Sequence, residues 1–81
     1  MISCSSYDYI EIVCLFAYPV IVTLKTGETL DGRAVDTARN INREECLKLT
    51  VDGVDVLVVL DEIAKLAVAI ENPHFNEVLF H

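Results

Sequence analysis

The sequence predicts a mainly β domain, a small bent barrel of five to six antiparallel strands preceded by one α-helix. Short runs in which apolar and polar residues alternate are separated by turn residues, as in antiparallel sheets. A glycine lies inside the longest of these runs, where a sheet can curl on itself. The N-terminal segment instead carries apolar residues at helical spacing. Residues 1–81 are long enough for one such domain, and we expect them to form a single unit.

One long hairpin dominates the first half of the chain. The segment Ile21–Lys25 alternates apolar and polar side chains, as a half-buried strand does. Thr26 and Gly27 supply the turn, because glycine reaches positive φ without steric cost. The returning strand, Glu28–Asp36, contains Gly32, which indicates a bend or a bulge. A long, bent, amphipathic hairpin favours a small barrel over a flat sheet.

The segment before this hairpin is predicted to be a helix that Pro19 ends. Ser5 is its predicted cap, with Asp8 three residues later, and Asp8 and Glu11 favour the positive end of the helix dipole. A strand over Tyr9–Val13 is the alternative, because β-branched residues weaken helices. The residues at helical spacing, which we expect to face the barrel, are Ile10, Val13, Cys14 and Ala17.

The second half of the chain reads as strands Cys46–Val51, Val54–Leu60 and Ile63–Ile70, with a short last strand in Glu77–Phe80. Helix formers make a helix the alternative for Ile63–Ile70. Thr37–Glu44 reads as a polar loop or strand end, and Asp52-Gly53 as a tight turn. The apolar run in Val54–Leu60 indicates burial on both faces. The predicted core consists of Val22, Leu24, Leu30, Leu47, Leu49, Val56, Val58 and Leu66.

The net charge of −7 comes from thirteen acidic and six basic residues. Nucleic-acid binding depends on Lys and Arg that neutralise phosphates, so the chain suits a basic protein surface better than RNA or DNA. The alternative is that the acidity only keeps a hydrophobic protein soluble. The sequence has no apolar run of membrane-spanning length and no signal-peptide pattern, so we expect a cytoplasmic protein. Three dispersed cysteines indicate reduced thiols.

No arrangement of residues that would support catalysis is present. The sequence lacks a nucleophile elbow, a phosphate-binding glycine loop and an HExxH motif. His74 and His81 are far from any cysteine pair with zinc spacing, so exposed histidines are the expected reading. Neighbouring carboxylates such as Glu44-Glu45 and Asp61-Glu62 do not face one another and should be solvated. We therefore expect no enzyme activity, no metal and no cofactor.

The hairpin resembles the first motif of Sm and Sm-like proteins through Val22-x-Leu24-x-x-Gly27-x-x-Leu30-x-Gly32-x-Ala34-Val35-Asp36. This resemblance implies an N-terminal helix followed by a bent antiparallel barrel. A generic hairpin in another small barrel is the alternative. RNA-binding Sm proteins hold a base with an Arg-Gly pair in their second motif. The matching stretch here is Leu60-Asp61-Glu62-Ile63, whose two acids oppose RNA binding.

A second pattern covers nearly the whole chain and consists of Cys4, Tyr7, Asp8, Ile10, Glu11, Ile12 and Cys14, the LKTGETL hairpin, Asp36, Leu60-Asp61-Glu62-Ile63 and Pro73. In this order and spacing, these residues resemble the Rof family of Rho-binding antiterminators. This resemblance implies an Sm-like barrel that binds the hexameric terminator Rho, occupies its RNA-binding N-terminal region, blocks RNA loading and suppresses termination. An acidic chain suits a surface that holds phosphates.

The resemblance also implies which residues contact Rho. They are Tyr7, Asp8 and Glu11 on the helix, and Asn40, Asn42 and Arg43 in the following loop. Without the resemblance, the helix residues read as an ordinary solvated face. We expect a monomer with no direct nucleic-acid contact. The alternatives are an Sm- or Hfq-like ring that binds RNA and an adaptor domain with another protein partner.

Overall fold

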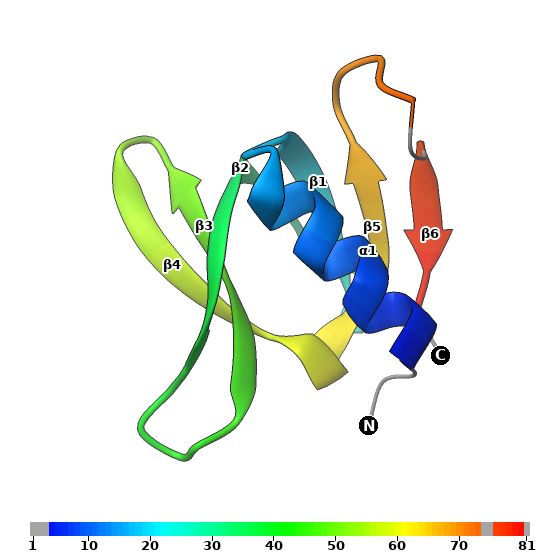
Figure 1. Ribbon diagram of the computed structural model, residues 1–81. Coiled ribbons are helices and arrows are strands. Elements are labelled where there is room, and N and C mark those ends of the chain that lie inside the picture. Colours follow the sequence, from blue (N-terminus) through cyan, green and yellow to red (C-terminus); the bar gives the residue numbers. More distant parts are fainter. Residues whose placement is uncertain (1–3, 74–75, 81) are drawn as a thin grey trace.

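The computed structural model describes the backbone of residues 4–73 and 76–80, and the side chains from residue 7 onward within these ranges. Six antiparallel strands form one sheet in the order β4-β3-β2-β1-β5-β6, with β4 and β6 at its edges (Figure 1). This confirms the predicted fold class. The elements are α1 (Cys4–Leu15), β1 (Pro19–Leu24), β2 (Thr29–Arg39), β3 (Glu45–Val51), β4 (Val54–Val59), a 3₁₀ turn (Leu60–Glu62), β5 (Ile63–Val68) and β6 (Glu77–Leu79).

Strand β2 is bent and pairs with a different neighbour along each half of its length. Its residues 29–33 pair with β1, and its residues 33–39 pair with β3. A Cβ atom on Gly32 would lie 2.8 Å from the Thr50 carbonyl oxygen and 2.9 Å from Cγ2 of Val51. Only glycine allows this close approach of β2 to β3. The irregularity that the sequence predicts at Gly32 lies a little later in the strand, between Ala34 and Asp36. The strand runs to Arg39, so residues 37–39 form a strand end, one of the two predicted alternatives, and residues 40–44 form the loop.

Both predicted hairpin turns are confirmed. The Leu24 N–H donates to the Glu28 carbonyl at 2.8 Å, and Gly27 between them has a φ of 96°. This is a three-residue loop that ends in a left-handed glycine. Asp52 and Gly53 have φ values of 52° and 82°, as in the tight turn that matches the twist of its strands. Residues 63–68 form a strand, so the helical alternative for this segment is wrong.

The helix confirms the main prediction for the N-terminal segment but differs at both ends. It begins at Cys4, so Ser5 lies inside the helix and not at its cap, and Asp8 lies beyond the first turn. It ends at Leu15 and not at the proline, which is instead the first residue of β1. The alternative prediction, a strand over Tyr9–Val13, is therefore wrong.

The helix ends before Pro19 because the backbone reverses at Ala17. This residue has a φ of 52°, and its N–H donates to the Cys14 carbonyl at 3.2 Å. The Tyr18 N–H donates to the Val13 carbonyl at 3.0 Å. These two bonds define a Schellman motif, with alanine in the position that usually holds glycine.

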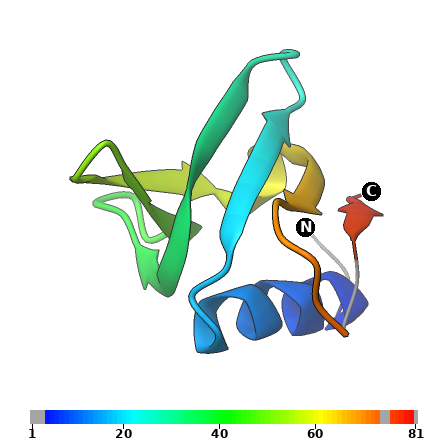
Figure 2. The ribbon, with the colours of Figure 1, turned by 90° about the horizontal axis from the view of Figure 1, so that it is seen from above.

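The helix packs on one side of the bent sheet and buries Ile10 and Val13 completely (Figure 2). Full burial of such a side chain contributes about 1.5–3 kcal/mol. Most of the predicted core is buried, but Leu24, Leu30 and Val56 are only partly so. The buried hydrophobic residues are Ile10, Val13, Tyr18, Val20, Val22, Ala34, Cys46, Leu47, Leu49, Val58, Leu60, Ile63, Leu66 and Phe80.

Strand β4 does not have two buried faces, so that prediction is wrong. Val54 is 62 % exposed and Leu57 is 43 % exposed. The strand lies at an edge of the sheet, and one of its faces meets solvent. An apolar run alone does not distinguish an edge strand from a central one. Across the described ranges, no helix is long and apolar enough to span a bilayer.

Candidate protein-binding surface

The loop between β2 and β3, residues 40–44, is organised by Asn40. Its Oδ1 accepts the N–H groups of Asn42 at 2.9 Å and Glu44 at 3.0 Å. Its Nδ2 donates to Oε1 of Glu44 at 3.1 Å, and Arg43 has a φ of 63°. An asparagine that binds the backbone ahead of it fixes a turn. The Asn40 amide therefore sets the shape of the loop, and the exposed Asn42 and Arg43 side chains project from it.

An ion pair closes the base of this loop. Arg39 and Glu45 are paired across β2 and β3, with 3.4 Å between Nη2 and Oε1. The Tyr7 hydroxyl donates a hydrogen bond to Oε2 of the same carboxylate. The hydrogen bond to Glu45, together with burial, raises the pKa of Tyr7 to about 12. Tyr7 thus joins α1 to the base of the loop.

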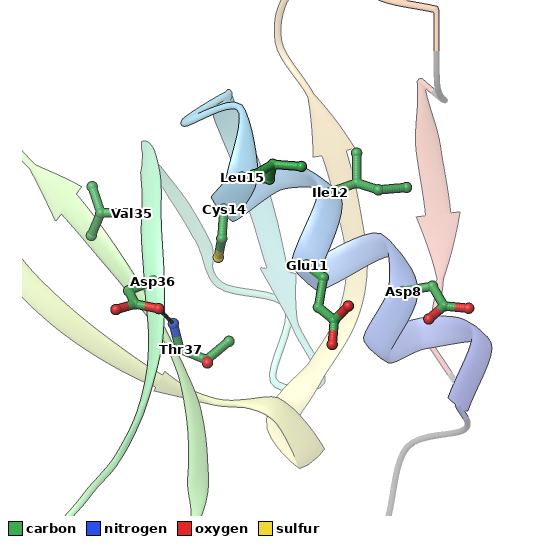
Figure 3. A pocket seen from close by; sticks show the side chains of 8 residues that line it. All are labelled: Asp8, Glu11, Ile12, Cys14, Leu15, Val35, Asp36 and Thr37. Atoms are coloured by element: carbon green, nitrogen blue, oxygen red, sulfur yellow. Dashed lines mark hydrogen bonds between the residues drawn. The ribbon is translucent and has the colours of Figure 1, made fainter.

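Two hollows lie between α1 and the outer half of β2. The larger, of about 530 Å³, is called the α1–β2 groove here (Figure 3). Glu11 and Cys14 project from α1 toward the gap between the helix and β2, which carries Asp36 and Thr37. The α1–β2 groove is lined by Asp8, Glu11, Ile12, Cys14, Leu15, Val35, Asp36 and Thr37.

The second hollow, of about 400 Å³, adjoins the base of the loop. Glu11 and Thr37 line both hollows, so the two form one continuous surface. Its other residues are Tyr7, Ala38, Arg39 and Glu45.

Half of the predicted contact residues, Tyr7, Asp8 and Glu11, line this surface. The other half, Asn40, Asn42 and Arg43, belong to the adjoining 40–44 loop and line neither hollow. Asp8 and Glu11 are exposed on α1. Tyr7 is a predicted Rho contact, and in the fold its hydroxyl already donates a hydrogen bond to Glu45. The Asn40 amide is likewise used within the loop.

Asp36, Arg39 and Glu45 also line this surface, although the sequence did not predict them as contact residues. The prediction that the Glu44-Glu45 pair is solvated is wrong for Glu45, which is partly buried and holds two partners. One signal was available, because Arg39 and Glu45 carry opposite charges near the two ends of the segment predicted as a polar loop or strand end. Nothing local in the sequence indicates that Tyr7 reaches this pair.

The cysteines of this region show no sign of activation. Burial, with Asp36 as a second cause, raises the pKa of Cys14 to about 11. Burial also raises the pKa of the Cys46 thiol. Both are free cysteines. Within the part of the chain that the structure describes, no group of three or more His, Cys, Asp or Glu side chains could hold a metal ion. His74 and His81 lie outside the described residues.

The stretch that corresponds to the second Sm motif forms the 3₁₀ turn between β4 and β5. Leu60 is buried there, whereas Asp61 and Glu62 are exposed. Two carboxylates therefore face solvent where RNA-binding Sm proteins carry a cation.

Comparison with known proteins identifies the family. The family model described as "Modulator of Rho-dependent transcription termination (ROF)" matches residues 1–80. The solved structure "YaeO bound to Magnesium from Vibrio cholerae O395" is 40 % identical in sequence, with a TM-score of 0.89. The match covers 93 % of this chain and 97 % of that one. No curated protein sequence matches the chain. The chain belongs to the Rof family of modulators of Rho-dependent transcription termination.

Proposed function

We propose that this protein binds the Rho hexamer over its RNA-binding N-terminal region, blocks RNA loading and so suppresses termination. The observation that carries the proposal is the surface formed by Asp8 and Glu11 on α1 and by the 40–44 loop, which the Tyr7–Glu45–Arg39 contacts hold together. Membership of a family that modulates Rho-dependent termination supports this partner. A surface that binds RNA is basic, and carboxylates complement it.

The proposed contacts differ in kind. Asp8 and Glu11 are exposed carboxylates that accept charge-assisted hydrogen bonds from basic groups of Rho. Asn42 and Arg43 are exposed on the loop and supply polar contacts. Tyr7 and Asn40 mainly hold the two segments in position, because their polar groups already have partners in the fold. The protein acts by occupying a surface, without catalysis, as a monomer in the cytoplasm where Rho works.

The test is co-elution of the purified protein with Rho, with and without RNA. The unmodified protein should co-elute with Rho and RNA should displace it. Glu11→Lys should abolish co-elution and restore Rho-dependent termination in a transcription assay, because it places a cation opposite a basic surface. Folding should be retained, since Glu11 is exposed and such substitutions shift stability by only about 0.5 kcal/mol.

Asp31→Lys is the matched control. Asp31 is an exposed carboxylate on β2 that lines neither hollow. A charge reversal at Glu77 would be a less suitable control, because its carboxylate lies 3.8 Å from Nζ of Lys65 and the change would also break this ion pair. Unchanged Rho binding by Glu11→Lys at both low and high salt would show that the α1 face is not the interface.

The alternative, an Sm- or Hfq-like RNA-binding ring, is disfavoured by the net charge and by the exposed acids at 61 and 62. Native mass and an RNA mobility-shift assay separate the two functions. A monomer that does not bind single-stranded RNA at physiological salt is the expected result. A ring-sized assembly with a sub-micromolar, salt-sensitive RNA complex would replace the antiterminator proposal.

A further inference from the structure

The α1–β2 groove combines an apolar lining with charges of one sign. Ile12, Cys14 and Leu15 of α1 and Val35 of β2 supply the apolar part. Leu15 is 77 % exposed and Val35 is 37 % exposed, so apolar surface on both walls meets solvent. The charged side chains that line the groove are the carboxylates of Asp8, Glu11 and Asp36.

A bulge in β2 places Val35 and Asp36 together on the outside. The β2–β3 register shifts between Ala34 and Asp36, which leaves Val35 as the extra residue. Ala34 is fully buried, whereas residues 35–37 are all exposed. In a regular strand, residues 34 and 36 would point to the same face. The bulge therefore leaves Asp36 on the exposed side of β2, where it lines the groove.

The groove has the chemistry that receives a long cationic side chain. Such a side chain lays its methylene stem on apolar surface and keeps its charged head among oxygen acceptors. Lysine and arginine both have this form, but a guanidinium carries five donors and is more weakly hydrated. These donors suit a groove that carries a carboxylate on each wall, Glu11 from α1 and Asp36 from β2.

We propose that the α1–β2 groove receives an arginine side chain of Rho, held between Glu11 and Asp36 with its stem against Leu15 and Val35. This inference rests on the proposed function and adds the β2 wall to the surface of α1 and the 40–44 loop. Asp36 is then a contact residue for the partner. Its Oδ1 also accepts the Thr37 N–H at 2.8 Å, which fixes the carboxylate in place.

Asp36→Asn tests the charge without disturbing the strand. The asparagine keeps an Oδ1 acceptor for the Thr37 N–H and removes only the negative charge. Loss of one charge-assisted bond should weaken binding to the Rho hexamer about tenfold, with a shallower dependence on salt. Asp31→Asn is the matched control, because Asp31 is an exposed aspartate on the same strand outside the groove. The affinity of this variant for the Rho hexamer should equal that of the unmodified protein.

A second variant tests occupancy of the groove. Val35→Lys, at an exposed position, places a cation of the chain itself beside Glu11 and Asp36, so it should compete with the arginine and weaken binding at least as much. Methyl NMR of the complex with the Rho hexamer gives a direct readout. The methyl signals of Ile12, Leu15 and Val35 should shift on binding, whereas those of Val54 and Leu57, exposed on β4, should not.

The outcomes separate the two proposals. If the unmodified protein fails to bind Rho, the proposed function is wrong. If Glu11→Lys abolishes binding while Asp36→Asn and Val35→Lys bind like the unmodified protein, the function stands and the groove proposal is wrong. Unshifted Leu15 and Val35 methyl signals in a complex that forms would also overturn the groove proposal.

Discussion

The Tyr7 hydroxyl on α1 donates a hydrogen bond to the Glu45 carboxylate on β3, although the two residues lie 38 positions apart in the sequence. Glu45 in turn pairs with Arg39, so one carboxylate joins the helix to both strands that carry the 40–44 loop. The two segments proposed to contact Rho are therefore fixed relative to each other before binding. A preorganised surface loses less entropy when it binds.

Tyr7→Phe should lower the free energy of unfolding by about 1 kcal/mol, because it removes a hydrogen bond to a charged acceptor at a partly buried site. Urea denaturation measures the change. Glu45→Gln and the double variant complete a double-mutant cycle. If the two single changes are fully additive, the contact does not stabilise the protein.

The same hydrogen bond predicts a dependence on alkaline pH. The pKa of Tyr7 is raised from 10.0 to about 12 in the folded protein. The stabilisation is therefore complete below pH 10.0 and is lost as the pH rises to about 12. Tyrosinate absorbance should show a group that titrates near pH 12 in the native protein and is absent in Tyr7→Phe. The contact has no such effect if both proteins give the same alkaline titration curve.

Asn40→Ala should loosen the 40–44 loop, because two backbone N–H groups lose their acceptor. Faster amide hydrogen exchange at Asn42 and Glu44 would report this. Asn42→Ala is the control, since the backbone and not the side chain of Asn42 makes the recorded bond. Equal exchange in both variants would mean that the Asn40 amide does not fix the loop.

Ala17→Gly should stabilise the protein by about 1 kcal/mol. A residue with a Cβ is strained at a φ of 52°, and glycine removes that strain. Thermal or urea unfolding measures the gain. Ala67→Gly, within β5, is the matched control and should destabilise the protein, because glycine weakens a strand. A loss of stability in both variants would contradict this account of the helix end.

Gly32→Ala should destabilise the protein by about 2 kcal/mol, since the new methyl group would overlap a backbone oxygen of β3. Val51→Ala, added to it, should restore only part of the loss, because the contact with the Thr50 carbonyl remains. Urea unfolding of the three variants checks this order. Wild-type stability of Gly32→Ala would mean that the two strands can separate at no cost.

The sequence by itself determined the features whose causes are local. Glycines at positive φ fixed both hairpin turns, and the alternation of side chains located the strands. The spacing of Ile10 and Val13 placed the helix against the core. Asp8 and Glu11 were recognisable as an exposed acidic pair for the same reason.

Only the tertiary structure decided features that depend on distant neighbours. Leu57 is exposed because its face of β4 meets solvent, which the apolar run of the strand does not indicate. The bulge at Val35 follows the point at which β2 changes partner, and it leaves Asp36 on the exposed side of the strand beside the groove. Tyr7 meets Glu45 because α1 packs across β2. Each depends on which segments meet in space, whereas periodicity and turn chemistry describe only neighbours along the chain.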